Sequence, residues 1–155
     1  MTITRPVVVL LREGPDEMEA ATTATRLVAG RSDLVVGVVS DDQEAEAILM
    51  ALSGGKPVVA AAGGVCPVWS RFVRAAEELG RTCRWETTTL AGLSATQIEL
   101  LWNLSLGLRV PEAARAASVS ERSAHRQLIA ARSRLGARTN AHAATIVRAG
   151  LTELS

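Results

Sequence analysis

Helix-start and helix-stop residues at regular intervals between positions 93 and 151 constrain this chain more than any other feature. Ser94, followed three residues later by Gln97, has the spacing of a capping box, in which each side chain bonds the other residue's backbone N–H. Gly107 is well placed to end the helix that follows, because glycine readily adopts the conformation that closes helices. These residues predict a helix from about Ser94 to Gly107.

A helix-turn-helix is predicted directly after it. Pro111 suits the first turn of a helix, where its missing N–H has no intrahelical partner. After a turn at Ser118 and Val119, Ser120 is a natural cap for the next helix, which Gly136 closes. A helix over about 120–135 therefore follows a short one that begins near Pro111.

The helix that begins at Ser120 has two different sides. Small and aliphatic residues recur at helical spacing on one side and are expected to pack inward: Ala124, Leu128, Ala131 and Leu135. The opposite side carries mostly polar residues, three of them arginine: Arg122, His125, Arg126, Ile129, Arg132 and Ser133. Guanidinium groups suit guanine edges and phosphates, so such a helix can enter the major groove of DNA. A solvated basic side on an ordinary helical bundle is the alternative, and charge alone does not decide between them.

The whole stretch resembles the C-terminal DNA-binding domain of the LuxR/NarL class of bacterial transcription regulators. The spacing holds without gaps across all the predicted helices. The matching positions are Leu93-Ser94, Glu99, Leu101, Gly107-Leu108, Glu112, Ala114, Ser120, Leu128, Arg134-Leu135-Gly136, Arg138-Thr139, Ala143 and Gly150-Leu151. The resemblance implies a four-helix domain whose last helix, roughly Asn140 to Ala149, often joins two subunits.

The resemblance also implies roles for individual residues of the third helix, which family members place in the major groove. Base contacts would fall on His125, Arg126 and Ile129. Arg122 and Arg132 would instead hold phosphates. These five residues are the candidate DNA-binding site.

Several positions depart from the family pattern, among them Ser123-Ala124-His125 in place of the usual Thr-Val-Lys. Gln97 stands where the family usually has glutamate, and Gln127 replaces a frequent histidine. Arg109 occupies the position where a serine or threonine usually caps the second helix. The family's base preference is therefore not carried over to this chain.

The N-terminal part alternates apolar runs of strand length with helical patterns. The predicted strands are Pro6–Leu11, Leu34–Val39, Pro57–Ala62 and an edge-like Thr82–Thr87, and the helices between them are Asp16–Val28, Gln43–Leu52 and Val68–Leu79. This order predicts an α/β fold with a parallel sheet flanked by helices. We expect an α/β domain over residues 1–87, a linker over 88–92 and the all-α helix-turn-helix domain over 93–155.

In architecture, the N-terminal part resembles the receiver domain of response regulators, of flavodoxin-like type, but it is shortened and degenerate. Receivers hold magnesium with an acidic pair after the first strand, where this chain has Arg12-Glu13. Glu13, Asp41 and Asp42 are candidates for a vestigial phosphorylation or ligand site, since cations need converging carboxylates. A simpler interpretation is that Asp41 and Asp42 cap the following helix.

Loops after the carboxyl ends of parallel strands are where open α/β sheets bind ligands. The N-terminal domain is therefore expected either to sense a small-molecule or protein effector or to mediate dimerisation. Trp69 and Phe72, on the predicted helix 68–79, are candidates for a dimer surface or for the core.

Charge is divided unevenly along the chain. Residues from Leu93 onward carry eight arginines and four glutamates, a net charge of +4, whereas residues 1–92 carry nine basic and twelve acidic residues, a net charge of −3. A cationic module joined to an acidic one suits a nucleic-acid reader with a separate control module.

Other classes of function lack support. His125 and His142, the only histidines, have no nucleophile in a supporting motif, so we expect no enzyme, no catalytic residue and no cofactor. Cys66 and Cys83 lack a second ligand pair, so no metal site is expected. The apolar runs are too short for a signal peptide or a membrane span, which leads us to expect a cytoplasmic protein.

Two hypotheses remain. The first is a sequence-specific transcription regulator that binds double-stranded DNA as a homodimer, with an N-terminal domain that acts without phosphorylation. The second is a protein-interaction module or anti-activator whose helix-turn-helix no longer binds DNA.

Overall fold

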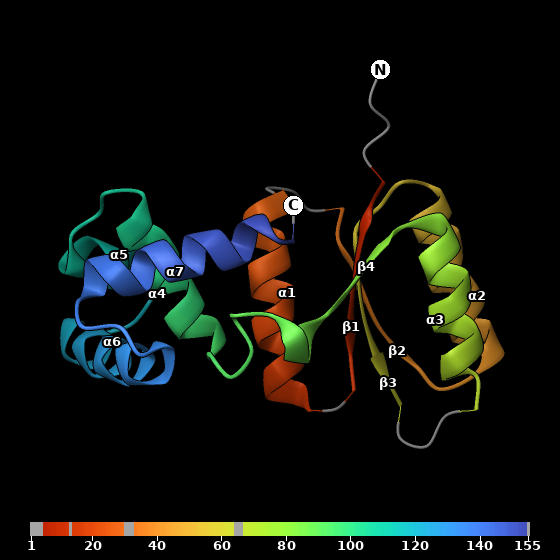
Figure 1. The fold of residues 1–155 in the computed structure, drawn as a ribbon, viewed down its shortest axis with the longest axis horizontal. Helices are drawn as coiled ribbons and strands as arrows, with labels where there is room; N and C mark the ends of the chain where they lie inside the picture. The colour runs from red at the N-terminus through yellow and green to blue at the C-terminus, as the bar shows by residue number, and fades with distance from the viewer. Residues whose placement is uncertain (1–4, 13, 30–32, 64–66, 155) are drawn as a thin grey trace.

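The computed structural model describes residues 5–12, 14–29, 33–63 and 67–154, and it consists of an α/β part followed by a helical part (Figure 1). The strands are β1 (Val7–Leu11), β2 (Val35–Val39), β3 (Val58–Ala62) and β4 (Arg81–Arg84), and the helices of the α/β part are α1 (Pro15–Ala29), α2 (Asp42–Ser53) and α3 (Trp69–Leu79). All strand pairs are parallel, in the order β2-β3-β1-β4. The expected parallel sheet is confirmed.

Helices cover both faces of this sheet, with α1 on one side and α2 and α3 on the other (Figure 1). Every residue of β1 is buried, because it is a central strand that packs against helices on both faces. In β2, at the edge, burial instead alternates along the strand. The apolar runs of the sequence therefore correspond to these strands, as expected.

The strand order corrects one detail of the receiver-like expectation. Flavodoxin-like domains have the order 2-1-3-4-5, in which β1 lies beside β2. Here β3 lies between β2 and β1. Strands are spaced just under 5 Å apart, so the carboxyl end of β2 lies roughly 10 Å from that of β1.

The predicted strand Thr82–Thr87 is only partly correct. The extended chain ends at Arg84, and Trp85–Thr87 forms a short 3-10 helix, η1. The Thr87 hydroxyl donates to the Arg84 carbonyl at 2.8 Å, and the Thr88 hydroxyl donates to the Trp85 carbonyl at 2.7 Å. These local bonds turn the backbone away from the sheet ladder.

Four helices make up the C-terminal part, as the cap residues predict: α4 (Ala95–Ser105), α5 (Val110–Ala116), α6 (Glu121–Leu135) and α7 (Asn140–Thr152). The capping box at Ser94 and Gln97 is present, with both bonds formed. Ser120 caps α6 by accepting from the Ser123 N–H, and Gly136 ends α6 in the left-handed conformation. Within the described residues, none of the helices has the length and apolar character needed to cross a bilayer.

The two parts share one apolar core. It runs from the α1 side of the sheet through Trp85 and Leu90 to the buried sides of the C-terminal helices. In Figure 1, α1 lies between the sheet and the helical bundle, and it packs on α4 and α7. Leu90, within the segment 88–92, is fully buried and lies against Gly150 of α7. The helical part is therefore held against the α/β part rather than tethered loosely to it.

Candidate nucleic-acid interface

The orientation of α6 is set by its buried side. Ala124, Leu128 and Ala131 are buried and pack against α4, α5 and α7. Ala113 and Ala114 of α5 are also buried, and their small side chains let α5 approach α6 closely. Because three helices hold the inner side of α6, its outer side is presented in a single direction.

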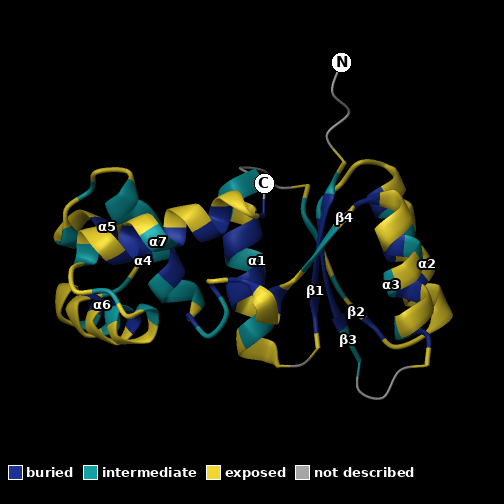
Figure 2. Ribbon diagram, in the orientation of Figure 1, coloured by how far each residue is buried: buried dark blue, intermediate teal, exposed yellow. Residues whose placement is uncertain are grey.

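That outer side is open to solvent. Arg122, His125, Arg126 and Ile129 are all exposed, and Ile129 is 59% exposed although it is apolar. In Figure 1, α6 lies at the end of the molecule away from the sheet, and Figure 2 shows exposed residues along it. The structure therefore brings four of the five candidate DNA-binding residues onto one accessible surface, which we call the α6 outer side.

The fifth candidate, Arg132, has a different environment. It is half-buried, and its Nη1 donates to the Arg138 carbonyl at 3.4 Å. Its Nε is buried without a hydrogen-bond partner. At about 100° per residue, Arg132 lies only about 40° from the buried Leu128 around the helix. Its guanidinium therefore already bonds to the turn after α6 and is only partly accessible.

His125 lies beside an acid on the same helix. Its Nε2 is 3.7 Å from Oε1 of Glu121, one turn earlier, so the two form an ion pair only when the imidazole is protonated. Both side chains are more than half exposed. Such a surface pair holds His125 only weakly and leaves it free to contact another group.

Two of the residues that depart from the LuxR/NarL pattern contact one another. Gln97 Nε2 of α4 donates to Gln127 Oε1 of α6 at 3.0 Å, across thirty positions of sequence. This bond is a polar link between α4 and α6. Arg109, which also departs from the pattern, is the N-cap residue of α5, but its side chain makes no cap hydrogen bond. Its Nε instead donates to Glu112 Oε1 at 3.0 Å.

The described acidic candidate residues of the N-terminal part already bond to other groups of the α/β part. Asp41 caps α2 by accepting from the Glu44 N–H at 2.8 Å, as the simpler interpretation predicts. Asp42 does not cap the helix, contrary to that interpretation: it is the first residue of α2 and forms a 3.2 Å ion pair with Arg71 of α3. Both follow β2, and β3 separates them from the end of β1. Glu13 lies outside the described residues, and the described residues contain no group of three or more His, Cys, Asp or Glu side chains placed to hold a metal ion.

One arginine of α6 has a role that its sequence position did not indicate. Arg134 lies in the last turn of α6, and its guanidinium occupies the space where Gly92 would carry a side chain. Gly92 has a φ of +85°. In the sequence, the only indication of this contact was the isolated Gly92 before the first predicted helix. Arg134 therefore packs at the junction of the two parts, away from the α6 outer side.

Comparisons with known proteins add little to this description. No protein-family model matches the sequence, and no curated protein matches it. Among solved structures, the chain is similar to the response regulator ChrA of a heme-sensing two-component system, at 17% identity and a TM-score of 0.36 over 99% of this chain and 100% of that one. A TM-score this low does not establish a common fold.

Proposed function

We propose that this protein is a sequence-specific DNA-binding transcription regulator that acts as a homodimer. The observation that carries the proposal is the α6 outer side: Arg122, His125, Arg126 and Ile129 are exposed on a helix whose inner side is locked by three neighbours. A helix of this kind fits the major groove, where arginine reads guanine bidentately and isoleucine contacts thymine methyl groups. In this proposal Arg122 and the partly exposed Arg132 hold phosphates, and no enzymatic activity is proposed.

A gel-shift series with genomic fragments tests this function. DNA binding should weaken steeply with salt, with a log–log slope of roughly −0.9 for each neutralised phosphate. Arg126→Ala should cost about 1–3 kcal/mol on the preferred site and little on other sequences, because a lost base contact reduces discrimination.

Arg74→Ala is the matched control, since Arg74 is an exposed arginine on α3, in the other part of the molecule. Its binding should equal that of the unmodified protein. An equal loss for Arg126→Ala on every sequence would make Arg126 a phosphate contact, and no binding at any salt concentration would refute the function.

The two edges of the sheet suggest how a homodimer forms. β4 carries arginines at both ends, and charged side chains are a common protection against edge-to-edge pairing. β2 contains only valine and glycine, and Val36 and Val38 are 42% and 46% exposed. A free strand edge satisfies its backbone donors and acceptors best with another strand, so we propose that β2 pairs antiparallel with β2 of a second copy.

This pairing is compatible with binding a two-fold symmetric DNA site. Val36 pairs in register with Val59, which packs on the α1 side of the sheet, so Val36 and Val38 also face that side. Antiparallel pairing about a two-fold axis normal to the sheet places both α1 sides together. The two helical parts would then lie on the same side of the dimer, as two half-sites require.

Light scattering during size exclusion tests the dimer. Val36→Lys should yield a monomer that retains binding to a single half-site but loses cooperative binding to two. Met50→Lys is the matched control, because Met50 is also an exposed apolar residue, at 68%, but belongs to α2, on the opposite face of the sheet from Val36. A monomeric Met50→Lys with a dimeric Val36→Lys would move the interface to α2.

A protein-interaction module that no longer binds DNA is the second candidate. Arg109 favours it, because α5 begins without the side-chain cap that normally stabilises this position by about 1 kcal/mol. This function predicts no gel shift at low salt, together with retention of a partner regulator on immobilised protein.

A further inference from the structure

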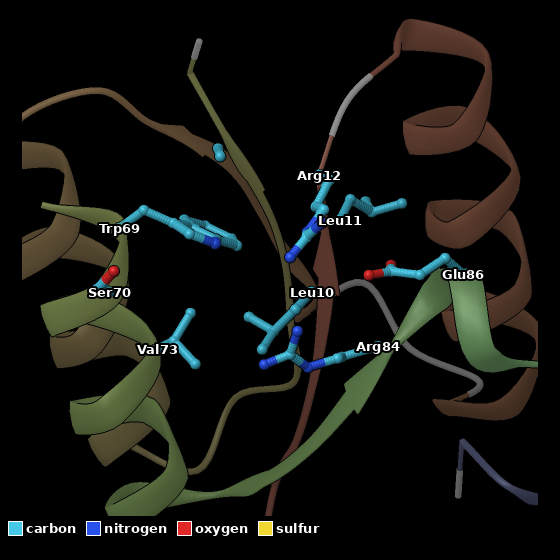
Figure 3. Close-up of a pocket in the computed structure, with 9 residues that line it drawn as sticks. Leu10, Leu11, Arg12, Trp69, Ser70, Val73, Arg84 and Glu86 are labelled. Carbon is cyan, nitrogen blue, oxygen red and sulfur yellow. The ribbon is translucent and has the colours of Figure 1, made fainter. Parts of the chain in front are cut away.

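We propose that the carboxyl end of the sheet binds a small organic anion, a carboxylate or phosphate monoester with an aromatic or other apolar group. The site is a cavity of about 350 Å³ on the α3 side of the sheet, which we call the strand-end cavity. Its lining residues are Leu10, Leu11, Arg12, Ala62, Trp69, Ser70, Val73, Arg84 and Glu86 (Figure 3). This site is separate from the α6 outer side, and its occupation does not depend on DNA binding.

The position of the cavity follows from the topology of the sheet. The chain leaves β1 to form α1 on one face, and it leaves β3 to form α3 on the other face (Figure 1). β1 and β3 are neighbours, so their connections diverge and leave a crevice beyond their carboxyl ends. Open α/β sheets bind ligands at such a switch point.

The register of the strands brings two arginines into this crevice. Arg84 of β4 pairs with Leu10 of β1, and the Leu10 side chain packs in the core on the α3 side. Side chains alternate along a strand, so Arg12, two residues after Leu10, projects toward the same side. Arg12 directly follows β1, Arg84 is the last residue of β4, and the two are 72 positions apart in sequence, yet they face one space.

These two guanidinium groups are available to a ligand. Neither Arg12 nor Arg84 forms an ion pair or a side-chain hydrogen bond with any of the described residues. Glu86 is the only acid in the lining, so the lining residues carry a net charge of +1. Two convergent guanidiniums bind carboxylate or phosphate oxygens through charge-assisted hydrogen bonds.

The opposite wall is aromatic and apolar. Trp69 projects from the first turn of α3 toward the two arginines, as Figure 3 shows, and Val73 lies one turn further along the helix. The Trp69 ring stacks on the buried Phe72 ring, with centroids 5.4 Å apart, which fixes one side of the indole and leaves it half-buried. A ligand with a planar or apolar group on one end and an anion on the other matches both walls.

The size of the cavity limits the ligand. A volume of about 350 Å³ lies near the lower end of the range for small-molecule pockets. A single ring with one anionic group fits such a volume, whereas a dinucleotide does not. Glu86 can accept a hydrogen bond from a ligand hydroxyl or amine.

Titration of the full-length, isotope-labelled protein with defined probes tests the site. The readout is the indole N–H signal of Trp69 in a two-dimensional NMR spectrum, assigned by its loss in Trp69→Phe. The probes are benzoate, phenyl phosphate and the neutral benzoate isostere benzamide. Arg12→Gln and Arg84→Gln remove one charge each, and Arg74→Gln removes an equivalent exposed charge from α3 outside the cavity.

We expect benzoate and phenyl phosphate to shift the Trp69 signal saturably, and we expect benzamide to bind at least about tenfold more weakly. Arg84→Gln and Arg12→Gln should each weaken anion binding at least about tenfold, and Arg74→Gln should leave it unchanged. The proposal is overturned if neither anion shifts Trp69 at about 10 mM, or if Arg74→Gln weakens binding as much as the cavity variants do. Equal binding of benzamide and benzoate would also overturn it.

Discussion

Arginine is presented in two different ways at the two ends of this molecule. On the α6 outer side, Arg122 and Arg126 project outward from a helix, beside the exposed His125 and Ile129. In the strand-end cavity, Arg12 and Arg84 converge on a partly open hollow beside Trp69. A protruding cationic helix fits the groove of a long polyanion, whereas converging cations fit one small anion. The same side chain therefore points to different ligands according to the shape of the surface that holds it.

The largest expected difference between these two regions is in salt dependence. If α6 neutralises six or more phosphates in a dimer, DNA affinity should fall on the order of 10³-fold between 50 and 200 mM salt. Binding of one benzoate in the strand-end cavity releases few counterions, and it should fall less than about fourfold over the same range. Parallel titrations by gel shift and NMR measure the salt dependence of DNA binding and of benzoate binding. Similar salt dependences would show that the two regions do not differ in how they bind anions.

Charge reversal on α6 should produce the next largest effect. The double variant Arg122→Glu, Arg126→Glu should lose at least about 100-fold in DNA affinity, because it replaces two attractions with two repulsions. Both residues are exposed, so the free energy of unfolding should change little. Fluorescence anisotropy with labelled DNA measures the loss. Benzoate binding should stay the same, and a parallel loss of both activities would show that the two regions are coupled.

Gly92→Ala tests the contact between the α/β part and the helical part. Alanine is strained at a φ of +85°, and its methyl group would displace the Arg134 guanidinium of α6. We expect a loss of about 1–2 kcal/mol in the free energy of unfolding, measured by urea denaturation. Gly55→Ala is the control, since Gly55 has a φ of +84° but open space around it, so the excess loss at Gly92 measures the Arg134 contact.

The smallest expected effect concerns Cys83, the residue before Arg84 on β4. Burial, with the charges of Glu153 and Glu86, raises the pKa of the Cys83 thiol above its ordinary value, although Arg81 opposes the shift. Because the pKa of the thiol is higher in the folded state than in the unfolded state, its contribution to the free energy of unfolding is fully present below the unfolded-state pKa. That contribution is lost as the pH rises through the folded-state pKa. The free energy of unfolding should therefore decrease above about pH 9.

Cys83→Ala isolates this effect, because the other cysteine is present in both proteins. Urea denaturation from pH 7 to 10.5 should give a steeper decline for the unmodified protein than for the variant. Identical curves would show that Cys83 is not more buried in the folded state than in the unfolded state. Since Cys83 and Arg84 are adjacent on a strand, they face opposite sides, so benzoate in the cavity should leave the Cys83 pKa unchanged.

The sequence alone determined the features that depend on neighbours a few positions apart. Ser94 and Ser120 begin helices and Gly136 ends one, each through bonds to residues no more than four positions away, so their roles follow from local spacing. The two sides of α6 follow from the helical period in the same way. The buried character of β1 is equally visible in its apolar run.

The tertiary structure decided which distant residues meet. The pattern of apolar residues along a strand does not indicate which strand lies beside it. The placement of β3 between β2 and β1 was therefore not predictable. That placement keeps Asp41 and Asp42 away from the end of β1, where Arg12 faces Arg84 and Trp69 instead. Local hydrogen bonds are encoded residue by residue, whereas the chemistry of a site depends on strand order and register, which only the packed chain establishes.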